Sequence, residues 1–307
     1  MTMPLIECVP NFSEGRRPEV IRAITDAIES GDAHILDVSS DVDHNRTVVT
    51  LVGGPTEIVE AAYQGIYAAS KLIDLTKHRG VHPRIGATDV VPLIPLRGTT
   101  MDECVLLARS LGKRVAEELN LPVFLYEAAA THPSRQNLAD IRRGGYERLQ
   151  ARMDANDLFS PDYGPAKLGP AGAVVIGARE PLIAYNAYLD TDDVSVAKSI
   201  ARQVRASGGG LPNLKAIGLE VDGRAQVSMN VIDFRQTSLF TITETVRAAA
   251  TQRGTKVVET ELVGLVPQGA LIDAALSYLG LPSDVRAKTL EFRMGAVTQD
   301  YREITFE

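Results

Sequence analysis

The stretch KHRGVHPRIGATD, residues 77–89, gathers two histidines and three strongly basic side chains in thirteen residues. His78 and His82 are four residues apart, a spacing that on a helix would put both imidazoles on one face and suggest zinc. Gly80 lies between them, and Pro83 disfavours the helical conformation at His82. The pair therefore does not share a helical face, and no third ligand follows at a characteristic spacing. We predict no metal site.

His82 is the first candidate for acid-base chemistry, because imidazole titrates near neutral pH. Lys77, Arg79 and Arg84 are close to it in sequence, and their positive charges disfavour the imidazolium form. We expect a largely neutral base that becomes an acid once an anionic substrate offsets the local charge. An ordinary solvent-exposed loop histidine is the alternative, and the residues alone leave both open.

Three further loops carry polar side chains. VPNFSEGRR, at 9–17, follows a strand-like run and opens a helix, so its amides and arginines could hold a carboxylate or phosphate; an ordinary turn is the alternative. DVSSDVDHNRT, at 37–47, is best explained as a solvated turn, because its acids lack the spacing of a calcium loop. PDYGPAKLGPAG, at 161–172, surrounds Lys167 with glycines and prolines but lacks the GK[ST] ending of a phosphate-binding loop.

Composition limits the classes of protein to consider. The chain has 307 residues, 45% of them hydrophobic and 23% charged, with a net charge of −7. This is ordinary for a globular protein and lacks the basic excess of a nucleic-acid binder. No apolar run is long enough to span a membrane, so we expect a cytoplasmic location. Cys8 and Cys104 stand among apolar neighbours, which favours buried thiols.

Strand-like and helix-like runs alternate along both halves of the chain, which favours layered α+β architecture. Thr100 and Glu103 have the spacing of a capping box, and Asp222–Gly223 is typical of a hairpin turn. The expected strands are 5–9, 34–38, 45–53, 90–96 and 122–127 in the first half, and 181–189, 214–221, 225–234 and 256–266 in the second. Helices are expected from Pro18, from about 56, over 104–119, 192–206, 241–252 and 268–279.

Both halves contain the order β-α-β-β-α-β. We therefore predict two ferredoxin-like subdomains, residues 1–178 and 179–307, with sheets stacked face to face and helices outside. A single large domain is the alternative for a chain of this length. The connector from Ser134 to about Gly172 has one periodic piece, a short helix near 138–149, and would roof a cleft between the subdomains. No GxSxG, GxGxxG or HExxH motif is present, so the residues indicate an enzyme or binding protein for a small anionic ligand.

Several long motifs resemble the glutamate formiminotransferase family. They are LIECVPNFSEGR at 5–16, DHNRTV at 43–48, KHRGVHPRIGATDVVP at 77–92 and AEELNLPVFLYE at 116–127, and they continue through PSRQNLADIRRGGYE, PDYGPAKLGPAGAVVIGAR and ELVGLVP. The resemblance covers essentially the whole chain. Animal members are fused to a cyclodeaminase, whereas this chain is similar to the stand-alone form.

The resemblance implies transfer of a formimino group from N-formimino-L-glutamate to N5 of tetrahydrofolate, with release of glutamate. It also implies a homodimer and a folate co-substrate. The catalytic histidine of the family motif maps to His82. The remaining candidate residues for binding substrate or folate are Asn11, Asp43, Asn45, Arg46, Arg79, Arg84 and, in the folate loop, Tyr163, Gly164, Pro165, Lys167, Gly169 and Gly172.

The family pattern is not complete in this chain. Animal members have an aspartate where this chain has Ser39, so the carboxylate that would orient His82 is uncertain, with Asp41 and Asp43 as substitutes. Other functions also remain open: a related transferase acting on 5-formyltetrahydrofolate or formiminoglycine, and a folate-binding protein without turnover. A hydrolase is disfavoured, because that chemistry usually needs a metal-activated water.

Overall fold

The computed structural model describes residues 4–155 and 159–298, and the chain divides at residues 179 and 180 into two compact units. Each unit has its own sheet and its own core, which confirms the predicted α+β class. The face-to-face arrangement of the two sheets stays a prediction. In the described part of the chain, no helix is both long and apolar enough to cross a membrane.

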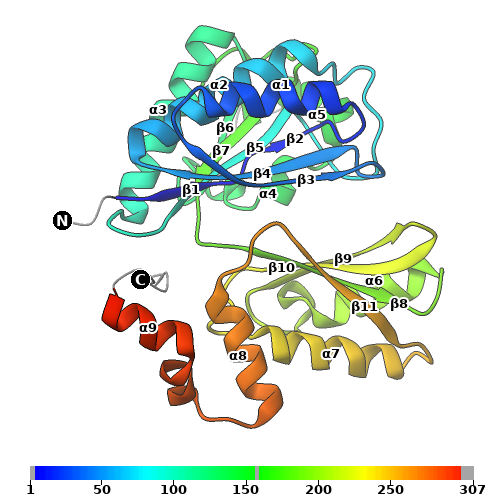
Figure 1. The fold of residues 1–307 in the computed structure, drawn as a ribbon. Coiled ribbons are helices and arrows are strands. Elements are labelled where there is room, and N and C mark those ends of the chain that lie inside the picture. Colours follow the sequence, from blue (N-terminus) through cyan, green and yellow to red (C-terminus); the bar gives the residue numbers. More distant parts are fainter. Residues whose placement is uncertain (1–3, 156–158, 299–307) are drawn as a thin grey trace. The chain divides into compact units, whose positions relative to one another are not determined.

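The first unit is built on a mixed seven-stranded sheet (Figure 1). Its sheet order is β3, β4, then β1 and β2 end to end between β4 and β5, then β5, β7 and β6. The elements are β1 (Ile6–Cys8), β2 (Asn11–Phe12), α1 (Pro18–Glu29), β3 (His34–Asp41), β4 (Arg46–Gly53), α2 (Pro55–Leu72), β5 (Thr88–Pro95), α3 (Met101–Leu119), β6 (Val123–Glu127), η1 (Pro133–Arg135), α4 (Leu138–Ile141), α5 (Gly145–Ala155) and β7 (Val174–Ala178).

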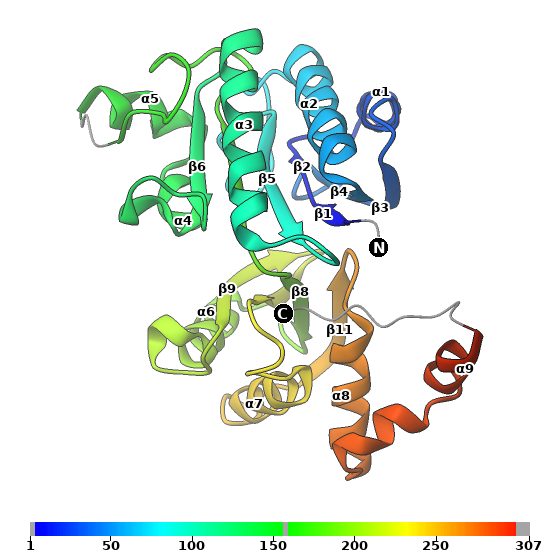
Figure 2. The same ribbon diagram turned by 90° about the vertical axis from the view of Figure 1, so that its left-hand side faces the viewer.

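The first five strands with α1 and α2 form the expected ferredoxin-like arrangement, and the sheet then continues. β7, which the sequence analysis missed, lies parallel to β5 and β6 and separates them. Val123 and Leu125 pack in the core under α3, whereas Phe124 and Tyr126 pack against α4 and α5. Figure 2 shows α3 and the pair α4 and α5 on opposite sides of β6. Both faces are apolar here, so both are covered by helices.

The connector helix predicted near 138–149 is in fact two helices. α4 ends at Ile141, and α5 starts at Gly145. Gly144 and Gly145 have φ angles of +86° and +67°, which the interior of an α-helix cannot contain. The double glycine therefore breaks the helix and leaves Arg142 at the C-terminal end of α4.

The second unit has the ferredoxin-like order β11, β8, β10, β9, with every pair antiparallel. Helices α6 and α7 supply the core on one face. The predicted hairpin turn at Asp222–Gly223 is present, with φ angles of +50° and +69°. The elements are β8 (Ile183–Leu189), α6 (Val194–Val204), η3 (Ala206–Gly208), β9 (Leu214–Val221), β10 (Arg224–Val231), α7 (Leu239–Thr251), β11 (Val257–Val263), α8 (Gln268–Leu279), η4 (Ser283–Lys288) and α9 (Leu290–Thr298).

Local sequence signals explain several element ends. α1 begins at Pro18, and the predicted capping box closes on α3, where the Thr100 hydroxyl accepts from the Glu103 amide. Cys8 and Cys104 are free and buried, as predicted.

Candidate active site

Three segments far apart in the sequence meet at the edge where β5 and β7 begin. The Ala87 amide donates to the Ala171 carbonyl at 2.8 Å, and the Ala173 amide donates to the Ile85 carbonyl at 2.9 Å. The Tyr146 amide, at the start of α5, donates to the Arg84 carbonyl at 2.9 Å. Since parallel strands start at the same edge of a sheet, the stretch 77–89 lies against the glycine-rich loop and against the connector helices.

His82 lies partly exposed in this stretch. Its Nδ1 is 2.7 Å from the Pro83 carbonyl oxygen. A neutral imidazole that donates its Nδ1 proton there keeps the lone pair of Nε2 for a substrate proton. Burial holds the pKa of His82 well below its usual range, and the charges of Arg46 and Arg142 lower it further against an opposing effect of Asp89. His82 is therefore neutral at neutral pH.

His78 is in a different environment, because both its ring nitrogens are occupied. Nε2 lies 3.0 Å from the Asn45 carbonyl, and Nδ1 accepts from Arg84 Nε at 3.0 Å. His78 as a whole is only 8% exposed. Within the described residues no three His, Cys, Asp or Glu side chains come together as ligands for a metal. His78 thus holds the loop in place and has no free nitrogen for chemistry.

A buried carboxylate between two arginines lies beneath this loop. Asp89 is 0% exposed; its Oδ2 is 2.7 Å from Arg46 Nη1 and 2.6 Å from Arg142 Nη2, and its Oδ1 accepts from the Ile85 amide. Burial would raise the pKa of Asp89, but Arg142 and Arg46 outweigh it and lower the pKa to about 2. Two positive charges against one negative charge leave an excess of positive charge near His82.

Asp89 and Arg142 are not among the site residues predicted from the sequence. Asp89 closes the HPRIGATD motif directly before the buried strand β5, where an ionisable residue must have a partner. That position was a usable signal. Arg142 had no such signal, because the IRRGGYE segment offers two adjacent arginines with nothing to distinguish them.

Neither substitute carboxylate contacts His82. Asp41 Oδ1 accepts from the His44 amide at 2.6 Å, and its Oδ2 is 3.7 Å from His44 Nδ1. Asp43 is exposed, and its carbonyl accepts from the Val81 amide. The imidazole of His44 in turn packs edge-on against that of His82, with ring centroids 5.7 Å apart. The partner of His82 Nδ1 is thus a backbone carbonyl, and Asp41 contacts the neighbouring histidine.

Several of the expected binding residues are already held by protein groups. Asn45, in the left-handed region at φ +49°, accepts from the Gly15 amide and donates to the Arg79 carbonyl, both at 2.9 Å. Arg46 Nε donates to Asn11 Oδ1 at 3.0 Å, and burial lowers the pKa of Arg46 to about 10. These contacts fix the loops around His82.

Three of the predicted basic binding residues differ in how accessible their side chains are to a ligand. Arg84 forms a two-pronged ion pair with Glu147, with N–O distances of 2.9 and 2.7 Å. Arg79 and Lys167 are exposed instead. The geometry therefore leaves Arg79 and Lys167 the more accessible of the predicted anchors.

The glycine-rich loop of residues 163–172 owes much of its composition to the backbone. The Tyr163 carbonyl accepts from the Val123 amide at 2.9 Å. Gly164 and Gly172 have φ angles of +83° and +71°, and a β-carbon at Gly172 would lie 2.2 Å from the Ile85 carbonyl oxygen. A β-carbon at Gly169 would have nothing within 4 Å. Pro165 is half-buried.

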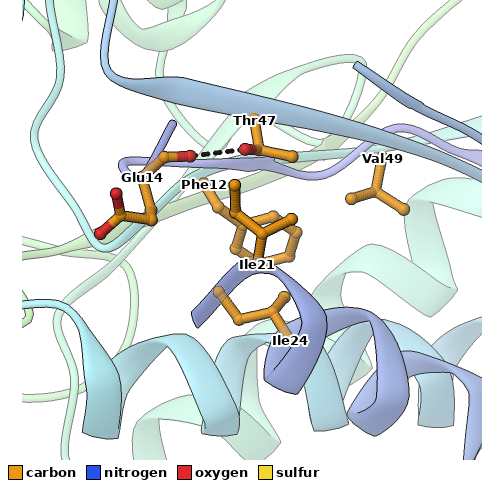
Figure 3. A pocket seen from close by; sticks show the side chains of 6 residues that line it. All are labelled: Phe12, Glu14, Ile21, Ile24, Thr47 and Val49. Atoms are coloured by element: carbon orange, nitrogen blue, oxygen red, sulfur yellow. Dashed lines mark hydrogen bonds between the residues drawn. The ribbon is translucent and has the colours of Figure 1, made fainter. Parts of the chain in front are cut away.

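A small gap between α1 and the sheet does not serve as a binding site. Figure 3 shows Ile21 and Ile24 of α1 pointing toward Phe12, with Glu14, Thr47 and Val49 around them. The gap leaves no space for a water-sized molecule. It is a packing defect in the core.

Comparison with known proteins covers both units. Residues 5–179 match the family model of the formiminotransferase domain, N-terminal subdomain, and residues 184–287 match that of the formiminotransferase domain. A glutamate formimidoyltransferase of Thermoplasma acidophilum is 47% identical over 297 residues, 95% of this chain and 98% of the relative. One of Streptococcus pyogenes serotype M1 is 46% identical over 279 residues, 90% and 93% of the two chains.

A fused relative matches over part of its length. The formimidoyltransferase-cyclodeaminase of Rattus norvegicus is 48% identical over 284 residues, which are 89% of this chain and 52% of the relative. The match thus includes about half of the fused protein. Two family models in sequence order and high identity over nearly the full length of two relatives show that this chain belongs to the formiminotransferase family.

Proposed function

We propose that this protein is a glutamate formimidoyltransferase, which moves the formimino group of N-formimino-L-glutamate to N5 of tetrahydrofolate and releases L-glutamate. The observation that carries the proposal is the identity of 46–47% to two proteins of that name over at least 90% of each chain. The neutral His82, with its Nε2 lone pair available, supplies chemistry that fits this reaction.

The reaction needs one proton removed and one delivered. N5 of the folate attacks the formimino carbon and forms a tetrahedral intermediate, in which the new N5–C bond and the old C–N bond to glutamate coexist. His82 accepts the N5 proton and then delivers a proton to the glutamate nitrogen, whose bond to carbon breaks as the amine leaves. Such acid-base catalysis contributes about 10²- to 10⁴-fold.

The remaining expected residues bind the substrates or position the loops around His82 in this proposal. The loop Tyr163–Gly172 binds folate, with Lys167 and Arg79 as exposed cations for its carboxylates. Asn11, Asn45, Arg46 and Arg84 hold the loops that surround His82, and the exposed Asp43 accepts from the Val81 amide next to His82. We further propose that tetrahydrofolate is the co-substrate, that no metal takes part, and that the enzyme works as a cytoplasmic homodimer.

Glutamate release with and without tetrahydrofolate tests the proposed function. Wild-type protein should release glutamate only when folate is present, and His82→Ala should lower kcat about 10²- to 10⁴-fold, because the proton transfers lose their carrier. His34→Ala is the matched control, since His34 is an exposed histidine at the start of β3. His78→Ala is a poor control, because it removes two buried contacts.

Other results would lead to different functions. Folate binding without glutamate release would indicate a binding protein, and release without folate would indicate a hydrolase. Equal activity in His82→Ala and His34→Ala would remove His82 from the mechanism.

A further inference from the structure

We infer that Arg142 binds the α-carboxylate of the formimino donor beside His82 and thereby selects α-amino-acid donors. The inference rests on the proposed function and adds a residue of the connector to the binding site. Its basis is the position, burial and incomplete hydrogen bonding of the Arg142 guanidinium.

The connector places Arg142 next to the stretch 77–89, which carries His82. α4 ends at Ile141, and the Arg142 amide still donates to the Leu138 carbonyl, so the residue is fixed at the end of a helix. Four residues later the Tyr146 amide donates to the Arg84 carbonyl, two residues from His82. Arg142 Nη2 reaches Asp89 at 2.6 Å, and the Ile85 amide binds the same carboxylate. The guanidinium is therefore held in position before any ligand arrives.

The guanidinium has hydrogen-bonding capacity that the protein does not use. Arg142 is 13% exposed, yet its Nε and Nη2 are buried without a hydrogen-bond partner of good geometry. Asp89 shares its charge between Arg142 and Arg46, so one positive charge in this cluster remains unbalanced. A buried, unbalanced guanidinium is stabilised by a carboxylate, which matches its forked geometry.

The position of the Arg142 guanidinium relative to His82 determines which carboxylate of the donor it binds. The nitrogen that leaves with glutamate must come within hydrogen-bond reach of His82. The α-carboxylate is attached to the carbon that bears this nitrogen, whereas the γ-carboxylate is three carbons away. Arg142 binds Oδ2 of Asp89, whose Oδ1 accepts from the Ile85 amide three residues from His82, and the charge of Arg142 also lowers the pKa of the His82 imidazole. The α-carboxylate is therefore the group that it can meet.

Donor analogues combined with variants test this assignment. Wild-type protein should lose about 10- to 100-fold in kcat/KM when the donor α-carboxylate becomes an amide, as expected for a lost charge-assisted hydrogen bond. Arg142→Ala should lower kcat/KM for the natural donor by a similar factor, should raise the donor KM and should leave the folate KM unchanged. The α-amide penalty should then largely disappear, because the partner is gone.

Two further variants separate binding from folding. Arg143→Ala is the matched control, since Arg143 is the neighbouring arginine and is 76% exposed. Arg142→Lys keeps a cation beside Asp89 but removes the fork, so it should fold normally and still discriminate less against the α-amide. Circular dichroism and thermal unfolding check the fold of each variant.

The outcomes are distinct. An α-amide penalty in Arg142→Ala equal to that of the wild type would overturn the assignment, as would kinetic constants equal to those of Arg143→Ala. If Arg142→Ala instead abolished the loss of kcat/KM that a γ-amide donor shows with the wild type, the choice of carboxylate would be overturned. Wild-type protein without folate-dependent glutamate release would overturn the proposed function itself.

Discussion

His78 and His82 are four residues apart in one loop, yet the protein gives them opposite environments. His78 is buried and uses both nitrogens inside the protein, whereas His82 uses one nitrogen and is partly exposed. The pKa of each histidine is lowered, in both cases first by burial. Availability of a nitrogen, rather than protonation state, therefore distinguishes the two residues.

The low pKa of His82 predicts how activity and stability depend on pH. We expect the acid limb of kcat/KM below pH 6.5, the ordinary value, because the free enzyme keeps His82 neutral. The acid limb of the kcat profile should lie at higher pH than that of kcat/KM. A carboxylate of the bound donor offsets the arginine charges, so it favours the imidazolium form of His82 and raises its pKa. Between the folded pKa and 6.5 the unfolded chain binds more protons, so stability should fall as pH falls through this window.

Two measurements check these pH effects. Initial rates across pH 5–8 give the two limbs, and urea unfolding of wild type and His82→Gln at the same pH values gives the stability difference. The wild type should lose more stability than the variant as the pH drops below 6.5. An acid limb of kcat/KM above 6.5, or parallel stability curves, would contradict the environment described for His82.

The sequence was informative about single residues only where local geometry is restrictive. Pro83 was enough to separate His82 from a helical metal pair, and the motif resemblance then selected His82 over His78. Asp89 and Arg142 are 53 residues apart along the chain, and their pairing depends on how the connector folds over the sheet. No local pattern encodes that distance, so the ion pair could not be predicted.

At the scale of elements, loops rather than helices or strands carry the site. The loop before β5, the loop before β7 and the connector between α4 and α5 each contribute, and backbone hydrogen bonds join the loop before β5 to the other two. Glycines allow these close approaches. The site is thus rigid where its segments touch, although it contains little regular structure.

Two glycines of the proposed folate loop should differ sharply in their effect on stability. Gly172→Ala should lower the free energy of unfolding by more than about 2 kcal/mol, since the residue has a positive φ and its β-carbon would clash with a carbonyl. Gly169→Ala should change it by less than about 0.5 kcal/mol, because its β-carbon meets open space. Urea unfolding measures both, and similar losses would argue against this loop geometry.

Most elements could be predicted from the periodicity of apolar residues, and β7 could not. Its sequence VVIGA is short, and all five of its residues are buried, so it has no alternating pattern. Tertiary pairing with β5 and β6 decided that case. The break between α4 and α5 is different, because the pair Gly144–Gly145 is a local turn signal that the prediction of one helix over 138–149 overlooked.

At the scale of the whole molecule, each unit contains a complete hydrophobic core. The core of the second unit is formed by its four strands together with α6, α7 and part of α8. All the site residues named above belong to the first unit. We propose that the units are separate domains with a boundary near residue 178.

The separate cores predict that the second unit folds without the first. A fragment of residues 180–307 should unfold cooperatively in urea and should give the circular dichroism of a mixed α and β protein. A fragment of residues 190–307 is the control, because it lacks β8, which pairs with both β10 and β11. Loss of cooperativity in the longer fragment would refute independent domains.

The position of β7 also governs the order in which the first unit can be completed during synthesis. β6 emerges from the ribosome before β7, yet it has no place in the sheet until β7 has paired with β5. The preceding strands can pair while the rest of the chain is still being made, whereas β6 must wait for about fifty further residues. A nascent chain that stops before Val174 would therefore expose the apolar side chains of β6, and this interval is when the protein most needs protection from aggregation.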